Sequence, residues 1–170
     1  MKFEEDRFPL LRRSVMTMMS FGLVGFATAR PALASEPSPA ITPAGKRKRP
    51  HRVIFHVDSG DEAIMGHAIG GAMNLGRYYG DKGEPPLIEI VANAAGIAMF
   101  RADKSPLADP IRALRELIPG LTLSVCGSSK AIAEKKEGQE ITLLEGVKVV
   151  PYGVGRLVDL QEAGWSYIHA

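Results

Sequence analysis

The chain has 170 residues, of which 45% are hydrophobic and 24% are charged, a composition typical of a globular domain. Its formal net charge of +2 and its aromatic content of 6% do not favour nucleic-acid binding, so we predict no nucleic-acid partner. The single cysteine, Cys126, excludes an internal disulfide framework and a zinc site built on several thiolates.

Residues 1–34 have the features of an export signal. Arg12 and Arg13 precede an apolar run that is shorter than the ~20 residues of a membrane span. The segment ends in Ala32-Leu33-Ala34, which places small residues where a signal peptidase cleaves. We therefore predict a twin-arginine signal peptide over 1–34, a periplasmic location and no stable membrane anchor after cleavage. The alternatives are an uncleaved anchor and a helix that belongs to the fold.

Residues 35–51 combine four prolines with the basic run KRKR and show no apolar periodicity. This composition predicts a flexible linker. Binding of the basic run to anionic lipid or to an acidic partner is the alternative.

From residue 52 onward, strand-like and helix-like segments alternate. Runs rich in β-branched and aromatic residues predict strands at 53–57, 87–92, 121–126, 147–152 and 165–169. Amphipathic stretches predict helices at about 61–79, 110–118, 128–136 and 154–163, with a short helical turn at 96–100. This order predicts an α/β domain over 52–170 with a mainly parallel sheet covered on both faces. Ligands of such sheets bind at the carboxyl ends of the strands.

The third predicted strand ends at Cys126, and Gly127, Ser128 and Ser129 lead into a helix that we expect Ser128 to cap. A thiol at a helix N-terminus faces free N–H groups and the positive end of the helix dipole, and both favour the nucleophilic thiolate. Gly127 leaves room beside the sulfur, and either serine can donate a hydrogen bond. The pattern is that of a sulfur-carrying or redox-active cysteine; the alternative is a buried cysteine that acts as a small hydrophobe.

Polar residues also follow the first two strands. His56 and Asp58 are two positions apart, so that their side chains point the same way and could bind a polar ligand. Alternatively, Asp58 caps the following helix and His56 is a hydrogen-bonded core histidine. Asn93 follows the second strand at the same predicted edge. The sequence has no metal-ligand spacing and no dinucleotide-binding fingerprint, so we predict no metal site and no cofactor.

Four segments together resemble the DsrE/DsrF-like sulfur-relay family, and more narrowly its exported single-domain members: VIFHVDSGDEAIMGHAIGGAMNLGRYYG, LIEIVANAAGIAMF, LTLSVCGSS and GVKVVPYGVGRLVDLQEAGWSYIHA. The resemblance implies a three-layer α/β/α fold with a five-stranded mainly parallel sheet, and assembly into a homo-oligomer, a trimer or hexamer. Characterised members accept sulfur as a persulfide on a cysteine and pass it to a partner protein. Here only Cys126 can take that role, and release of the sulfur would need an outside thiol.

The sequence leads to two main hypotheses. In the first, the protein is an exported sulfur carrier or sulfurtransferase-like protein that accepts sulfane sulfur as a persulfide on Cys126 and meets a sulfur-transfer partner protein. The residues that would line its site are His56, Asp58, Asn93, Gly127 and Ser128. In the second, it is a non-catalytic oligomeric DsrE-like module that binds a small ligand or a partner protein in the periplasm. A third reading is an interaction protein recruited through the basic linker. The residues alone leave open whether the protein is an enzyme.

Overall fold

Five parallel strands form the sheet of the folded domain. The computed structural model describes residues 50–170, so the predicted signal peptide and all but the last two residues of the predicted linker lie outside the described residues. The strands are β1 (Arg52–Val57), β2 (Leu87–Ala92), β3 (Leu121–Cys126), β4 (Val147–Val150) and β5 (Ser166–His169). Their order in the sheet is β4-β3-β2-β1-β5, and every neighbouring pair is parallel.

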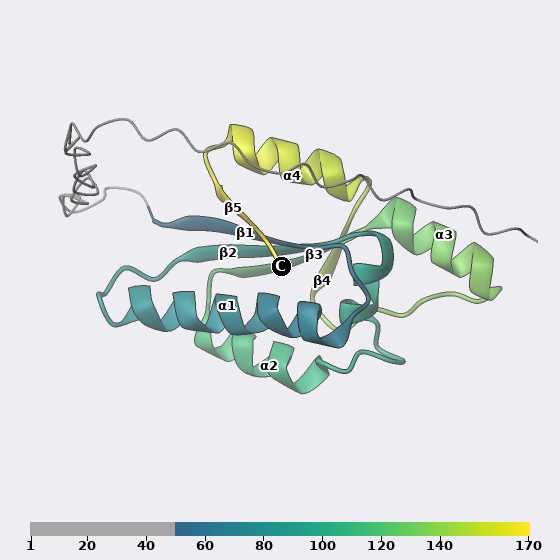
Figure 1. The fold of residues 1–170 in the computed structure, drawn as a ribbon, viewed down its shortest axis with the longest axis horizontal. Helices are drawn as coiled ribbons and strands as arrows, with labels where there is room; N and C mark the ends of the chain where they lie inside the picture. Colours follow the sequence, from purple (N-terminus) through teal and green to yellow (C-terminus); the bar gives the residue numbers. More distant parts are fainter. Residues whose placement is uncertain (1–49) are drawn as a thin grey trace, which may run out of the picture. The chain divides into compact units, whose positions relative to one another are not determined.

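Helices cover both faces of this sheet. They are α1 (Glu62–Gly80), the 3₁₀ helix η1 (Ala94–Phe100), α2 (Ala108–Leu117), α3 (Gly127–Glu137) and α4 (Gly153–Glu162). Figure 1 shows α1 and α2 on one face of the sheet and α4 on the other. The predicted three-layer α/β/α fold is thereby confirmed. Among residues 50–170, no helix is both long enough and apolar enough to cross a bilayer.

The two faces of the sheet bury very different amounts of apolar surface. The face toward α1 and α2 carries the larger core, which includes Phe55, Ile90 and Leu114. The face toward α4 buries a cluster of only four residues, with Trp165 packed against them: Ile54, Val91, Leu157 and Leu160. Because side chains alternate along a strand, His56 and Cys126 point to the same face as this smaller cluster.

Most element boundaries follow from local chemistry. β2 and β3 have the predicted bounds, and β4 ends at Val150 because Pro151 has no N–H to continue the ladder. α1 begins after Asp61, whose carboxylate accepts the N–H groups of Ala63 and Ile64 at 2.8 and 3.2 Å. The expectation that Ser128 caps α3 is wrong, since the N-cap is Cys126 itself.

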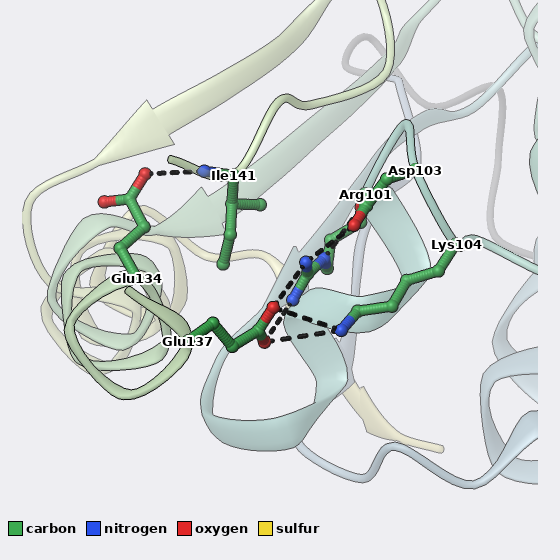
Figure 2. A network of polar contacts seen from close by, with 6 residues as sticks. All are labelled: Arg101, Asp103, Lys104, Glu134, Glu137 and Ile141. Atoms are coloured by element: carbon green, nitrogen blue, oxygen red, sulfur yellow. Dashed lines mark hydrogen bonds and ion pairs between the residues drawn. The ribbon is translucent and has the colours of Figure 1, made fainter. Parts of the chain in front are cut away.

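A polar network ties the end of η1 to α3 (Figure 2). The buried guanidinium of Arg101 donates to both carboxylate oxygens of Glu137, at 2.6 and 2.8 Å, and to Asp103 at 2.8 and 2.9 Å. The hydrogen bonds from Arg101 lower the pKa of Glu137 to about 2. Glu134, one turn earlier in α3, accepts the N–H of Ile141 at 2.9 Å. α3 is therefore fixed at its C-terminal end by charged side chains.

Candidate functional site

The one cysteine lies where β3 passes directly into α3. Cys126 is 6% exposed, and its Sγ accepts the Ser129 N–H at an N···S distance of 3.5 Å. The Ser129 hydroxyl oxygen in turn accepts the Ala94 N–H at 2.9 Å, so that η1 holds this serine in place. The sulfur is thus the N-terminal cap of a helix, and the backbone N–H of Ser129 is directed at it.

The surroundings of Cys126 favour its charged form. Burial raises the pKa of the thiol, because it removes water from the thiolate. The polar groups around the sulfur act in the opposite direction and outweigh burial: these are the Ser129 side chain and the backbone N–H groups of Gly153, Ser129 and Ser128, of which the Ser129 N–H makes the hydrogen bond to Sγ. The pKa of Cys126 therefore lies below its ordinary value, as a nucleophilic or sulfur-accepting thiol requires.

Two glycines allow backbone to approach the cysteine from both sides. A Cβ at Gly153, the first residue of α4, would lie 3.0 Å from the Cβ of Cys126 and 3.2 Å from the Cβ of Asn93. A Cβ at Gly127 would lie 3.1 Å from Val149 and 3.2 Å from the Val150 carbonyl oxygen. All four distances are shorter than an ordinary carbon contact of about 3.5–4.0 Å. The start of α4 thus lies between Cys126 and Asn93.

His56 links Asn93, the residue that follows β2, to Tyr167 of β5 at this edge of the sheet. Its Nε2 lies 2.9 Å from Oδ1 of Asn93, and its Nδ1 lies 2.7 Å from the hydroxyl of Tyr167. A neutral imidazole satisfies both contacts by donating from Nε2 to the amide oxygen and accepting the phenol proton at Nδ1. The amide of Asn93 is therefore oriented with its oxygen toward His56 and its nitrogen away from it.

Asp58 contacts a different histidine. Its Oδ1 lies 3.3 Å from Nε2 of His169, whose ring centre is 5.2 Å from that of His56. The alternative role of Asp58 as the cap of α1 is wrong, because Asp61 takes that position. Ser128 contributes through its backbone, since its N–H donates to the Pro151 carbonyl at 3.2 Å.

The structure thus brings most of the predicted residues to one edge, together with three residues that the predicted site did not include. Cys126 and Asn93 flank the start of α4, and Asn93 contacts His56. The additional residues are Gly153, Tyr167 and His169, of which Gly153 directly follows the fourth predicted strand and could be expected at this edge. Tyr167 and His169 are two positions apart on β5. This strand pairs with β1 so that His169 lies opposite His56. Among residues 50–170, no group of three or more acidic, histidine or cysteine residues could hold a metal ion.

Comparisons with known proteins place this site on a known fold. The chain matches no family model, and no curated protein matches it. Among solved structures, it is 31% identical to the protein of unknown function MTH1491 from Methanobacterium thermoautotrophicum, covering 71% of this chain and 99% of that chain with a TM-score of 0.57. YchN from E. coli is 11% identical over the same shares of the two chains, with a TM-score of 0.49.

Proposed function

This chain belongs to the same protein family as MTH1491, and from that premise and its sequence resemblance to the DsrE/DsrF-like family we propose that it is an exported sulfur carrier or sulfurtransferase-like protein. In this proposal Cys126 accepts sulfane sulfur as a persulfide. The observation that carries it is the position of Sγ at the helix start, with the Ser129 N–H 3.5 Å away and a pKa below the ordinary value of a thiol. A thiolate is the form that attacks a sulfane sulfur.

The proposed step needs no oxidant or reductant. The Cys126 thiolate attacks the outer sulfur of a donor persulfide, R–S–SH. A bond forms between Sγ and that sulfur while the donor's own sulfur–sulfur bond breaks, and the donor leaves as the thiolate R–S⁻. The outer sulfur keeps its proton, so the product is Cys126–S–SH and charge is conserved. An outside thiolate, such as one on a partner protein, removes the sulfur by the same attack.

The neighbouring polar residues would line the path of the donor. Asn93 presents its amide nitrogen away from His56, where it can donate to a sulfur or oxygen atom of the donor. Asp58, Gly127 and Ser128 border the same edge of the sheet. Since no step requires His56 to gain or lose a proton, we assign it to orienting Asn93.

Sulfur loading provides the test. The purified chain is incubated with an inorganic polysulfide and its intact mass is measured; we expect an added mass of about 32 Da that a reductant removes. Cys126→Ser is the matched control and should gain no mass. A Cys126 that alkylates only after unfolding, or that never gains sulfur, contradicts the proposal.

Export and self-association are part of the same proposal. A twin-arginine signal over 1–34 would bring the folded protein to the periplasm, and the mass of protein recovered from that compartment tests cleavage after Ala34. Exposed apolar residues support a homo-oligomer, a trimer or hexamer: Tyr152 is 70% exposed and Val154 is 62% exposed, and Val158 follows one turn later on α4. Val154→Asp should then lower the mass found by sedimentation.

The second candidate is a non-catalytic oligomeric module that binds a small ligand or a partner protein in the periplasm. The observation that favours it is the same exposed apolar surface of α4, which needs no reactive thiol to act. Cys126→Ser separates the two candidates. If partner binding and assembly persist in this variant and wild-type protein never gains sulfur, the binding module is the better description.

A further inference from the structure

A half-exposed arginine of α4 binds a buried carboxylate on the face of the sheet that carries Cys126. Glu89 lies in β2 and is 1% exposed. Its Oε1 accepts the Ser124 hydroxyl at 2.7 Å and Nε of Arg156 at 2.9 Å, and its Oε2 accepts Nη2 of Arg156 at 2.7 Å. The carboxylate is fully hydrogen-bonded, and Arg156 binds it through two parallel N–H groups.

Stability alone is a poor explanation for this pair. Removing a carboxylate from water costs several kcal/mol, and buried ion pairs can often be replaced by apolar residues without loss of stability. The two-pronged contact differs from apolar packing in one respect: it fixes the orientation of the two side chains relative to each other as well as the distance between them. It therefore sets the rotation and the height of α4 above the sheet.

At the start of α4 the backbone is held by the Ser128 N–H, which donates to the Pro151 carbonyl at 3.2 Å, but side chains of the first turn add little that could set its rotation. Its N-cap residue, Tyr152, makes no side-chain capping hydrogen bond. A cavity of about 350 Å³ borders this turn, lined by residues that include Tyr152, Gly155 and Arg156. The apolar contacts of the helix, through Leu157 and Leu160, lie further along it. Arg156 is thus the anchored side chain closest to the helix start.

That start is the part of α4 which contacts the thiol. Gly153 precedes Arg156 by one turn, and a Cβ at Gly153 would lie 3.0 Å from the Cβ and 3.6 Å from the Sγ of Cys126. A small rotation of the helix would change the distance between Gly153 and the sulfur. We propose that Glu89 and Arg156 form a positioning pair, which holds the N-terminal turn of α4, the positive end of its helix dipole, against Cys126.

The inference deepens the proposed function, because it takes Cys126 as the working group, yet its test is independent of sulfur. The rate of Cys126 alkylation by iodoacetamide is measured against pH in the full chain. Arg156→Lys keeps the charge and loses the two-pronged contact, whereas Glu89→Gln/Arg156→Met removes both charges. We expect both variants to move the midpoint of the profile to higher pH and to react about three- to tenfold more slowly at pH 7.

A matched control separates position from general stability. Arg101→Met/Glu137→Gln removes another two-pronged pair with one buried partner, Arg101, in the network of Figure 2. It should lower the melting temperature and leave the alkylation profile in place. The proposal is overturned if Arg156→Lys retains the wild-type profile, since charge would then suffice, or if the control moves the profile as far as the Glu89 and Arg156 variants do.

The two proposals fail in different ways. If wild-type protein gains no sulfur from polysulfide while both variants shift the alkylation profile, the sulfur-carrier function is wrong and the positioning role stands. If wild-type protein gains sulfur and the profile of both variants is unchanged, only the positioning role is wrong.

Discussion

Gly96 lies where η1 crosses the carboxyl end of β1, and replacing it by alanine tests how tightly the site edge is built. A Cβ at this position would lie 2.3 Å from the carbonyl oxygen of Val57 and 2.7 Å from its carbon. These backbone atoms cannot rotate away. The Gly96 N–H also donates to the Asp58 carbonyl at 3.2 Å, and the Asn93 N–H to that of Val57 at 3.0 Å. Gly96→Ala should therefore push η1 and Asn93 away from β1.

The size of the effect follows from these contacts. An ordinary carbon–oxygen contact of about 3.3 Å requires η1 to move by about 1 Å. Overpacking of this kind costs about 1–3 kcal/mol, and each of the two weakened hydrogen bonds about 1 kcal/mol more. We expect a loss of about 3–5 kcal/mol from the about 5–15 kcal/mol that keeps a domain folded. The melting temperature should fall by about 3–6 °C for each kcal/mol in a domain of this size.

Urea unfolding and thermal melting followed by circular dichroism measure this loss. Gly66→Ala is the matched control, because Gly66 lies within α1 and a Cβ there meets no atom within 4 Å. Glycine is unfavourable inside a helix, so this variant should gain about 0.5–1 kcal/mol. A loss below about 1 kcal/mol for Gly96→Ala, with the control behaving as expected, would refute the tight crossing of η1 over β1.

Three further predictions follow from individual contacts. Gly153→Ala should push the start of α4 off Cys126, raise the pKa of the thiol and slow its alkylation at pH 7; an unchanged rate would contradict the contact. Glu137 has a pKa of about 2 instead of the ordinary 4.5, so its contribution to stability is complete above about pH 4.5 and is lost as the pH falls toward 2. In thermal melts at stepwise lower pH, the melting temperature of Glu137→Gln should approach that of the wild type. A difference in melting temperature that stays constant with pH would argue against this. Leu114→Ala, at a fully buried position, should cost about 2–5 kcal/mol in urea unfolding, and a smaller loss would mean that the core relaxes around it.

Much of the fold was accessible from the sequence because strands and helices depend on neighbouring residues. β2 and β3 end where their apolar runs end, at Ala92 and Cys126. The junction of Cys126 with a glycine and two serines predicted a helix start, although the serine expected to cap it is not the cap. Local patterns also predicted that polar residues after parallel strands lie at one edge, since all parallel strands end on the same side.

The sequence by itself thus determined the elements, the parallel sheet and the placement of its one thiol at a helix N-terminus. Only the tertiary structure decided what surrounds that thiol. Tyr167 reaches His56 because β5 returns beside β1, and Gly153 reaches Cys126 because α4 packs on the face of the sheet to which Cys126 points. Each contact joins residues far apart in the chain, through the order of the strands and the docking of a helix. Periodicity and capping signals act over a few residues, so they carry no information about which distant elements become neighbours.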